Sequence, residues 1–204
     1  MSQPTGPEAG AAIHLLTVLV SAALTDNILL TRFLGMCSFL AISRQMKAAA
    51  GLGLAVTFVT TITCAVNAAF YNLVLKPHGL ESLQLILFIV VIAGFVQFLE
   101  MLIERVSLPL YYALGIFLPL ITVNCAVLGA ALFMTNRNYG VAEGLVFGFG
   151  SGAGWMLAIV LMAGIRERLK NAQIPPALEG PGITLIITGI IALGFVGFSG
   201  MVQP

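Results

Sequence analysis

LGIFLPLITVNCAVLGAAL, residues 114–132, is an apolar stretch of membrane length that contains both a proline and a cysteine. Pro119 has no backbone N–H and clashes with the carbonyl four residues earlier, so it predicts that a helix kinks or stops near Leu118. At membrane depth, freed backbone groups are tolerated only where protein or a lined cavity satisfies them. Polar side chains and a thiol follow directly, namely Thr122, Asn124 and Cys125. The stretch therefore predicts a broken membrane span with a candidate metal ligand beside the break.

A similar pattern occurs earlier in the chain. When Cys37 is placed on Cys125, an offset of 125 − 37 = 88, NILLTRFLGMCSFLA (residues 27–41) aligns with GIFLPLITVNCAVLG (residues 115–129). Each cysteine then lies nine residues after an isoleucine. Apolar matches arise easily by chance in so hydrophobic a chain, so the value of this similarity depends on the topology.

The composition is that of an integral membrane protein. Of the 204 residues, 59% are hydrophobic and only 8% are charged, whereas soluble domains have about 25% charged residues. The polar first ten residues contain no Lys or Arg, so we expect no cleavable signal and a first span that stays in place. A net charge of +1 provides no basic field for nucleic acid. Three cysteines form neither a disulfide framework nor a CxxC motif.

Hydrophobicity predicts an all-α membrane protein with six transmembrane helices, because about 20 apolar residues are needed to cross the hydrocarbon. A polar N-terminal segment, residues 1–10, precedes a single membrane domain, residues 11–204. The six expected spans are residues 11–35, 48–75, 82–102, 110–134, 141–164 and 183–202.

Basic residues orient these spans, because Lys and Arg in short loops are retained on the cytoplasmic side. The side with both termini holds two of them, Lys76 and Arg137. The opposite side holds six, Arg44, Lys47, Arg105, Arg166, Arg168 and Lys170. We therefore predict that both termini lie on the outer side of the membrane.

In this topology the first and fourth spans run in opposite directions, so their cysteine segments are antiparallel copies. This predicts two inverted three-helix repeats, residues 11–102 and 110–202, with discontinuous first and fourth helices and a functional site near the midplane. Residues 11–42 number 42 − 10 = 32, about 48 Å as one helix, which exceeds a hydrocarbon core of about 30 Å. We expect a bend near residues 25–27 or near Gly35.

Several motifs identify a family. They are FLGMCSFLAIS (33–43), YNLVLKP (71–77), LGIFLPLITVNCAV (114–127), GFGSGAGWMLAIV (148–160), AGIRER (163–168) and GFSG (197–200). The chain resembles the family that contains the E subunits of bacterial sodium-translocating NADH:quinone oxidoreductases. It is similar, less closely, to the A subunits of Rnf ferredoxin:NAD oxidoreductases. The resemblance covers nearly the whole chain after the first ten residues.

The resemblance implies a subunit of an NADH:ubiquinone reductase, a translocase that exports sodium and is not active as a single chain. In this family, two homologous six-span subunits, D and E, are inserted in opposite orientations and hold a [2Fe-2S] cluster at their interface. Each gives two cysteines, which correspond here to Cys37 and Cys125. Flavins and quinone belong to other subunits of a six-subunit complex. The alternatives are an Rnf-type subunit, an ion-path transporter subunit without a redox role, or a scaffold.

The three cysteines differ in their predicted roles. Iron–sulfur clusters require four thiolate ligands, and this chain offers two at repeat-related positions, so a partner must complete the set. Cys64 has no counterpart in the other repeat and is interpreted as a packing residue. Without the repeat and the resemblance, packing is also the favoured interpretation of Cys37 and Cys125.

Ionisable residues within spans are costly and often functional. Glu100, near the cytoplasmic end of the third span, is a candidate for the sodium path, with pairing to a basic loop residue as the alternative. Asp26 and Arg32 are six residues apart, so they pair only if the helix breaks between them, and a structural role is favoured.

Glycines are frequent in the last two spans. The run at 144, 148, 150, 152 and 154 does not fit a nucleotide-binding loop and predicts close helix packing instead. We expect the same role for glycines 189, 194, 197 and 200. His14 and His78 are isolated and do not fit a haem site.

Overall fold

The computed structural model describes residues 7–106, 118–170, 172, 175 and 178–198, and this part of the chain contains helices and no strand. The α-helices are α1 Pro7–Val20, α2 Met36–Ile42, α3 Met46–Phe70, α4 Lys76–His78, α5 Gln84–Val106, α7 Leu118–Thr122, α8 Cys125–Asn136, α9 Val141–Leu169 and α10 Pro181–Val196. Short π- or 3₁₀-helical turns are η1 Ser21–Thr25, η2 Tyr71–Leu75 and η3 Glu81–Leu83. The predicted all-α class is confirmed for these residues.

Three helical stretches in the described residues are long and apolar enough to cross a membrane, namely Met46–His78, Glu81–Leu102 and Val141–Leu169. They correspond to the second, third and fifth predicted spans. Three further apolar helices are shorter, namely Gly10–Thr25, Leu120–Asn136 and Pro181–Val196. The predicted start of the fourth span at residue 110 and the end of the sixth at residue 202 lie outside the described residues.

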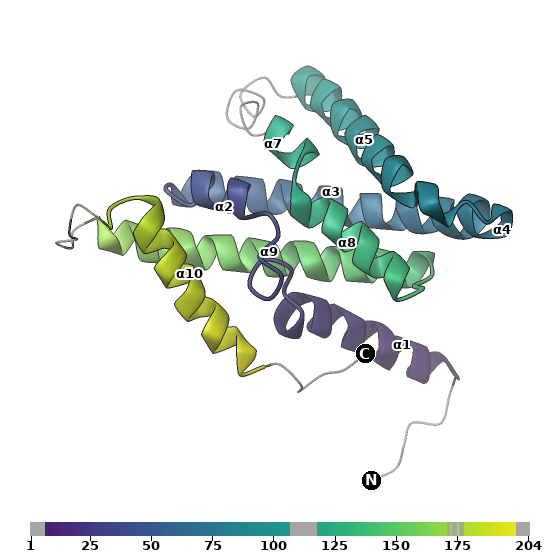
Figure 1. Ribbon diagram of the computed structural model, residues 1–204, viewed down its shortest axis with the longest axis horizontal. Coiled ribbons are helices and arrows are strands. Elements are labelled where there is room, and N and C mark those ends of the chain that lie inside the picture. Colours follow the sequence, from purple (N-terminus) through teal and green to yellow (C-terminus); the bar gives the residue numbers. More distant parts are fainter. Residues whose placement is uncertain (1–6, 107–117, 171, 173–174, 176–177, 199–204) are drawn as a thin grey trace, which may run out of the picture.

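The two longest helices, α3 and α9, lie side by side at the centre of the molecule (Figure 1). Helix α5 packs on α3 and α10 packs on α9, and they lie on opposite sides of the central pair (Figure 1). Helices α1 and α8 cover the remaining length, with α1 packed on α9 and α8 packed mainly on α3. The core is therefore built around the α3–α9 contact.

Glycines allow α9 to approach α3 closely. A Cβ added at Gly148 would lie 2.7 Å from the carbonyl oxygen of Thr60, and one at Gly152 would lie 2.6 Å from the Cα of Thr57. No side chain larger than hydrogen fits such a contact without a backbone shift. The predicted packing role is confirmed at these positions.

A second glycine face of α9 contacts the first segment of the chain. A Cβ at Gly150 would lie 2.9 Å from the carbonyl oxygen of Leu19, and one at Gly154 would lie 2.6 Å from that of Ala23. At Gly144 the nearest atom would be a methionine sulfur, at 2.8 Å. All five glycines of the run therefore serve helix packing.

The same expectation is wrong for α10. A Cβ added at Gly189 or Gly194 would meet nothing within 4 Å among the described residues, and one at Gly197 would approach only the carbonyl oxygen of Gly194, at 3.3 Å. Helix α10 lies at the edge of the molecule, and the part of the chain that the structure describes brings no other helix against these glycines (Figure 1). Residue 200 lies outside the described part.

Threonine hydroxyls in α3 are satisfied by their own helix. Thr57, Thr60 and Thr63 donate to carbonyl oxygens four residues earlier at 2.8, 2.6 and 2.7 Å. Such back-bonding lets polar side chains lie in a buried helix without partners elsewhere. Cys64 lies among these threonines and is 0% exposed. A Cβ added at Gly148 would lie 2.8 Å from the Cβ of Cys64, so the position of Cys64 fits the packing role predicted for it.

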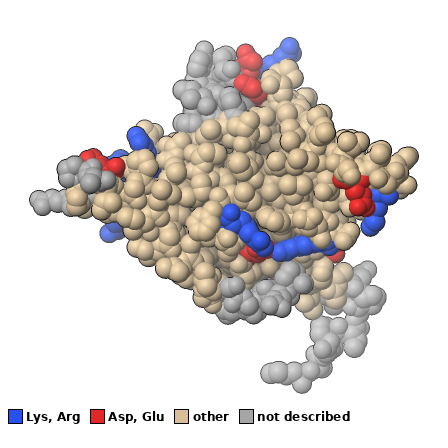
Figure 2. All heavy atoms as spheres, viewed as in Figure 1, with Lys and Arg blue, Asp and Glu red and all other residues tan. Residues whose placement is uncertain are grey.

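The surface is largely uncharged. Figure 2 shows charged side chains mainly at the tips of the molecule, together with one short basic band near its middle. Large apolar side chains are exposed along α5 and α10, including Ile86, Val90, Ile190 and Leu193, which are 62, 63, 63 and 73% exposed. A soluble monomer does not expose apolar surface on this scale, so these faces suit lipid or neighbouring subunits.

Candidate metal-ligand site

The first cysteine segment is interrupted at both predicted positions. Helix α1 continues through η1 to Thr25, and α2 begins only at Met36, after Gly35. Asn27 satisfies backbone groups in the interruption, because its Oδ1 accepts from the N–H groups of Leu29 and Leu30 at 3.1 and 3.2 Å. Its Nδ2 donates to the carbonyl oxygens of Ala23 and Gly154 at 3.0 and 2.8 Å. The break is thus a hydrogen-bonded structure held against α9.

Gly35 ends this interruption in a conformation that other residues rarely adopt. Its φ is +81°, in the left-handed region that favours glycine. A Cβ at this position would lie 2.7 Å from Trp155 Nε1 and 2.9 Å from Asn124 Oδ1. Both the backbone angle and the space require glycine, and α2 with Cys37 begins directly afterwards.

The predicted kink or stop near Leu118 concerns a helix that enters from residue 112, and that approach lies outside the described residues. Within the described part, helix α7 Leu118–Thr122 contains Pro119. An interruption follows at residues 123–124, and Asn124 caps α8 by accepting from the N–H of Ala126 at 3.0 Å. Cys125 is the first residue of that helix.

The two cysteine segments contact each other beside the thiols. Asn124 Nδ2 donates to Ser38 Oγ at 3.3 Å, and Ser38 Oγ donates to the carbonyl oxygen of Gly35 at 3.0 Å. Ser38 directly follows Cys37, and Asn124 directly precedes Cys125. The structure therefore brings the two predicted ligand segments together although they are 88 residues apart in sequence, from 125 − 37.

Further contacts show that the segments run in opposite directions. A Cβ at Gly129 would lie 2.6 Å from Leu34 Cδ1, and the guanidinium of Arg32 lies 4.9 Å from the ring centroid of Phe133. From Gly129 to Phe133 along α8, the residue contacted in the first segment moves back from Leu34 to Arg32. The stretch of chain before α2 and helix α8 are therefore antiparallel neighbours.

An acidic side chain joins the far ends of the two segments. Asp26 accepts from Arg32 Nε at 3.3 Å and from Arg137 Nη2, and Arg137 follows the end of α8. The pairing of Asp26 with Arg32 confirms the prediction that they meet if the helix breaks between them. Sequence reasoning missed Arg137, because a partner 111 residues away leaves no local spacing signal.

The cysteines differ in accessibility. Cys37 and Cys125 are exposed, whereas Cys64 is buried. Cys125 lines an apolar pocket of about 480 Å³ between α8 and α5, whose walls include Ile92 and Leu128. At the start of α8, the helix dipole favours negative charge, as a thiolate ligand requires.

Two thiols are an incomplete ligand set. No group of three or more His, Cys, Asp or Glu side chains suited to a metal ion occurs among the described residues. A four-thiolate centre would therefore need two more ligands from another chain. The surface position of Cys37 and Cys125 is compatible with such sharing.

Glu100 lies in α5, near its C-terminal end, and is partly exposed. The ion pairs between described residues involve other side chains, so the alternative of pairing with a basic loop residue has no support in this part of the chain. Its role in a sodium path stays a prediction.

Comparison with known proteins gives two concordant results. Residues 15–202 match the family described as "Rnf-Nqr subunit, membrane protein". The chain is 54% identical over 194 residues, 92% of its length and 98% of the relative, to a protein of Serratia proteamaculans (strain 568). That relative is named as the E subunit of the Na(+)-translocating NADH-quinone reductase.

Proposed function

Because the chain belongs to the Rnf-Nqr family of membrane subunits, we propose that it is the corresponding subunit of a sodium-translocating NADH:ubiquinone reductase. In this proposal Cys37 and Cys125 supply half the ligands of an intramembrane [2Fe-2S] cluster. The chain is one part of a translocase and has no activity alone. The contact between the two cysteine segments, through Ser38 and Asn124, is the observation that carries the proposal.

The donor set fits half of such a centre. Thiolate sulfur is the usual ligand of iron–sulfur clusters, and two exposed thiols on contacting segments match a cluster shared between chains. The third cysteine is fully buried and unsuited to bridging subunits. A [2Fe-2S] cluster held by Cys37, Cys125 and two thiolates of a partner would supply one-electron transfer within the membrane.

The chain's own residues position the ligands. Asn124 fixes the first turn of α8, and with it the backbone of Cys125. Gly35 and Ser38 hold the start of α2 against Asn124, so the backbones on either side of the thiols are tied to each other. The apolar walls of the pocket beside Cys125 exclude water, which lowers the local dielectric constant.

The partner in this proposal is the homologous six-span D subunit, which is inserted in the opposite orientation and gives two further cysteines. Two features support inverted three-helix repeats within our chain. The cysteine segments are antiparallel neighbours, and α5 and α10 flank the central pair on opposite sides (Figure 1). Flavins and ubiquinone are assigned to other subunits of a six-subunit inner-membrane complex, with both termini of this chain in the periplasm.

Sodium export is proposed to follow from charge compensation. An electron that enters a low-dielectric centre adds negative charge, and a cation that moves with it offsets the cost. Glu100 is the candidate for attracting sodium in this chain, because a carboxylate is a suitable oxygen ligand for a hard cation.

The proposal is tested by replacing each cysteine in the purified complex. Cys37→Ala and Cys125→Ala are each expected to remove the iron of one [2Fe-2S] cluster and to abolish quinone reduction, while the subunits still assemble. Cys64→Ala is the matched control and should retain the iron. Elemental analysis and low-temperature electron paramagnetic resonance measure the outcome. Full iron content in both of the first two variants would contradict the ligand assignment.

The family also includes Rnf-type subunits, and the relative from Serratia favours the NADH:quinone branch. The electron donor distinguishes them. The purified complex should reduce quinone with NADH, and activity only with reduced ferredoxin would assign the chain to the Rnf branch.

A further inference from the structure

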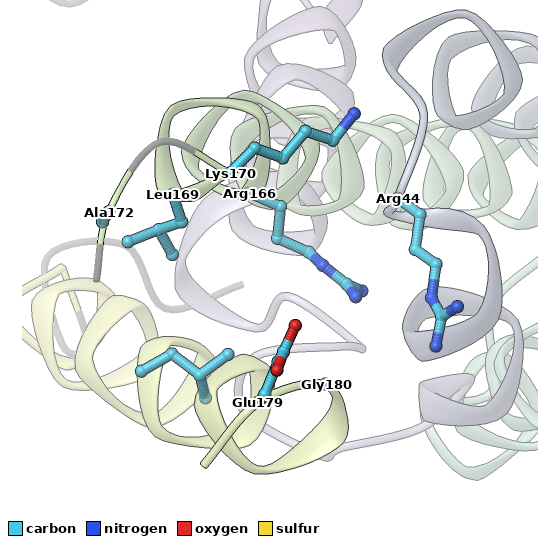
Figure 3. Close-up of a pocket in the computed structure, with 8 residues that line it drawn as sticks. Arg44, Arg166, Leu169, Lys170, Ala172, Glu179 and Gly180 are labelled. Carbon is cyan, nitrogen blue, oxygen red and sulfur yellow. The ribbon is translucent and has the colours of Figure 1, made fainter. Parts of the chain in front are cut away.

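A basic pocket lies between the C-terminal end of α9 and the start of α10. It has a volume of about 610 Å³. Among the described residues, three cationic side chains line it, Arg44, Arg166 and Lys170, together with one carboxylate, Glu179. Figure 3 shows the side chain of Glu179 and the guanidinium of Arg166 directed into the same opening, with Arg44 on the opposite wall.

Positive charge in this pocket is only partly compensated. Three cations against one carboxylate leave an excess of two, from 3 − 1. The ion pairs within 4.0 Å between described residues involve other side chains, so the carboxylate does not neutralise a particular cation. Arg166 Nη1 donates to Ser43 Oγ at 2.8 Å and to the carbonyl oxygen of Leu40 at 3.2 Å, which holds its guanidinium at the wall. An anion is the complementary ligand.

Apolar surface continues from the pocket along α10. Ile183 lines the basic pocket, and Ile186, Ile190 and Leu193 line a second groove of about 670 Å³. Their spacing of three, four and three residues places all four side chains on one face of the helix. Ten residues at 1.5 Å each span about 15 Å, which is half of a hydrocarbon core of about 30 Å. The apolar face of α10 is therefore about as long as the hydrocarbon layer of one leaflet is deep.

We infer that this site binds an anionic phospholipid, with its phosphate among Arg44, Arg166 and Lys170 and an acyl chain along the isoleucine face of α10. Basic pockets between membrane helices are suited to phosphate-bearing headgroups, and each Lys or Arg adds to the attraction. Inorganic phosphate has the same charge chemistry but no apolar part. The groove on α10 therefore favours the lipid. This inference does not rest on the thiol site.

Phosphatidylglycerol titrated into the delipidated, detergent-solubilised complex tests the site, with binding measured by native mass spectrometry. Removing two cations in Arg44→Gln/Lys170→Gln should weaken binding about 25-fold, at about fivefold per basic residue. Both side chains are exposed, so the variant should fold. The matched control is Lys47→Gln/Arg168→Gln, which removes the same charge from exposed residues that do not line the pocket. The control should bind within about twofold of the unmodified complex.

Two further binding measurements identify the ligand. Ile190→Ser should weaken phosphatidylglycerol binding, and inorganic phosphate should fail to displace the lipid. Equal losses in the two double variants would overturn the inference, because they would show non-specific attraction. Displacement by inorganic phosphate at the same concentration, or unchanged lipid binding in Ile190→Ser, would overturn it in favour of a free-anion site.

Discussion

The two cysteine segments reach the same arrangement by different means. In both, an exposed thiol lies in the first turn of a helix that follows an interruption. Before Cys37 the interruption is ten residues long and ends at a glycine with positive φ, whereas before Cys125 it is two residues long and ends at an asparagine cap. The segments therefore share the position of the thiol at the start of a helix, but not the backbone geometry that leads to it.

The longer interruption depends on the shorter one. Gly35 lies against the side chain of Asn124, and Ser38 accepts a hydrogen bond from it. Asn124 caps its own helix through Oδ1 whether or not Nδ2 has a partner. Gly35 adds a positive φ to this contact, so we expect its replacement to be the most damaging, the loss of the Asn124 side chain to rank next, and changes at the far ends of the segments to matter least.

Gly35→Ala should have the largest effect. The left-handed backbone disfavours a Cβ, and the added atom would lie 2.7 Å from Trp155 Nε1, so the free energy of unfolding should fall by about 2 to 4 kcal/mol. Thermal denaturation of the purified complex measures the loss. Gly94→Ala is the control, because a Cβ there meets nothing within 4 Å, and it should leave stability unchanged or slightly higher.

Asn124→Ala should cost less, about 1 to 2 kcal/mol, because it removes the cap of α8 and the hydrogen bond to Ser38. The same denaturation assay applies. Asn136→Ala, at the exposed far end of α8, should stay within about 0.5 kcal/mol of the unmodified chain. A greater loss for Asn124→Ala than for Gly35→Ala would contradict this ranking and show that the Asn124 side chain contributes more to stability than the backbone conformation of Gly35.

Asp26→Asn should cost about 1 kcal/mol. It weakens the ion pairs that join the ends of the segments, and the side chains of Asp26 and Arg137 are 23 and 28% exposed, so solvent screens part of the interaction. High salt should reduce the difference from the unmodified chain, as measured by denaturation temperature at two ionic strengths. A difference that is independent of salt would show that charge is not its origin.

Arg32→Gln should have the smallest effect, about 0.5 kcal/mol. Its side chain is 49% exposed, and it contributes a screened ion pair and a contact over the ring of Phe133. Comparison with Asp26→Asn in the same assay checks the ranking. A larger loss than for Asp26→Asn would mean that the stacking contact, not the ion pair, holds this part of the first segment.

Length and polarity were sufficient to predict the interruption of the first segment. An apolar run of 32 residues is too long for one crossing, and it contains the polar residues and glycine at which the helix ends. The spacing of the cysteines also separated Cys37 and Cys125 from Cys64, and the structure exposes the first two while burying the third. These features follow from local composition and distance along the chain.

Other features depend on neighbours that a pattern does not reveal. The interruption at residues 123–124 comes after Pro119, and the side chain of Asn124 caps the helix that follows it. Glycines of α9 pack against α3, α1 and η1, whereas among the described residues a Cβ at Gly189 or Gly194 of α10 would meet nothing within 4 Å, although these helices are similarly rich in glycine. Trp155 has no sequence signal that connects it to the cysteines, and Ser38, although it adjoins Cys37, has none that connects it to Asn124; both roles are recognised only from contacts around Gly35.

The two glycine faces of α9 have a consequence for biosynthesis. One face receives α3 and the other receives α1 and η1, and all of these precede α9 in the chain. Both receiving surfaces are therefore synthesised before α9 leaves the ribosome. With insertion in the order of synthesis, α9 is the last of these central helices to arrive, and its two glycine faces join surfaces that otherwise contact each other little.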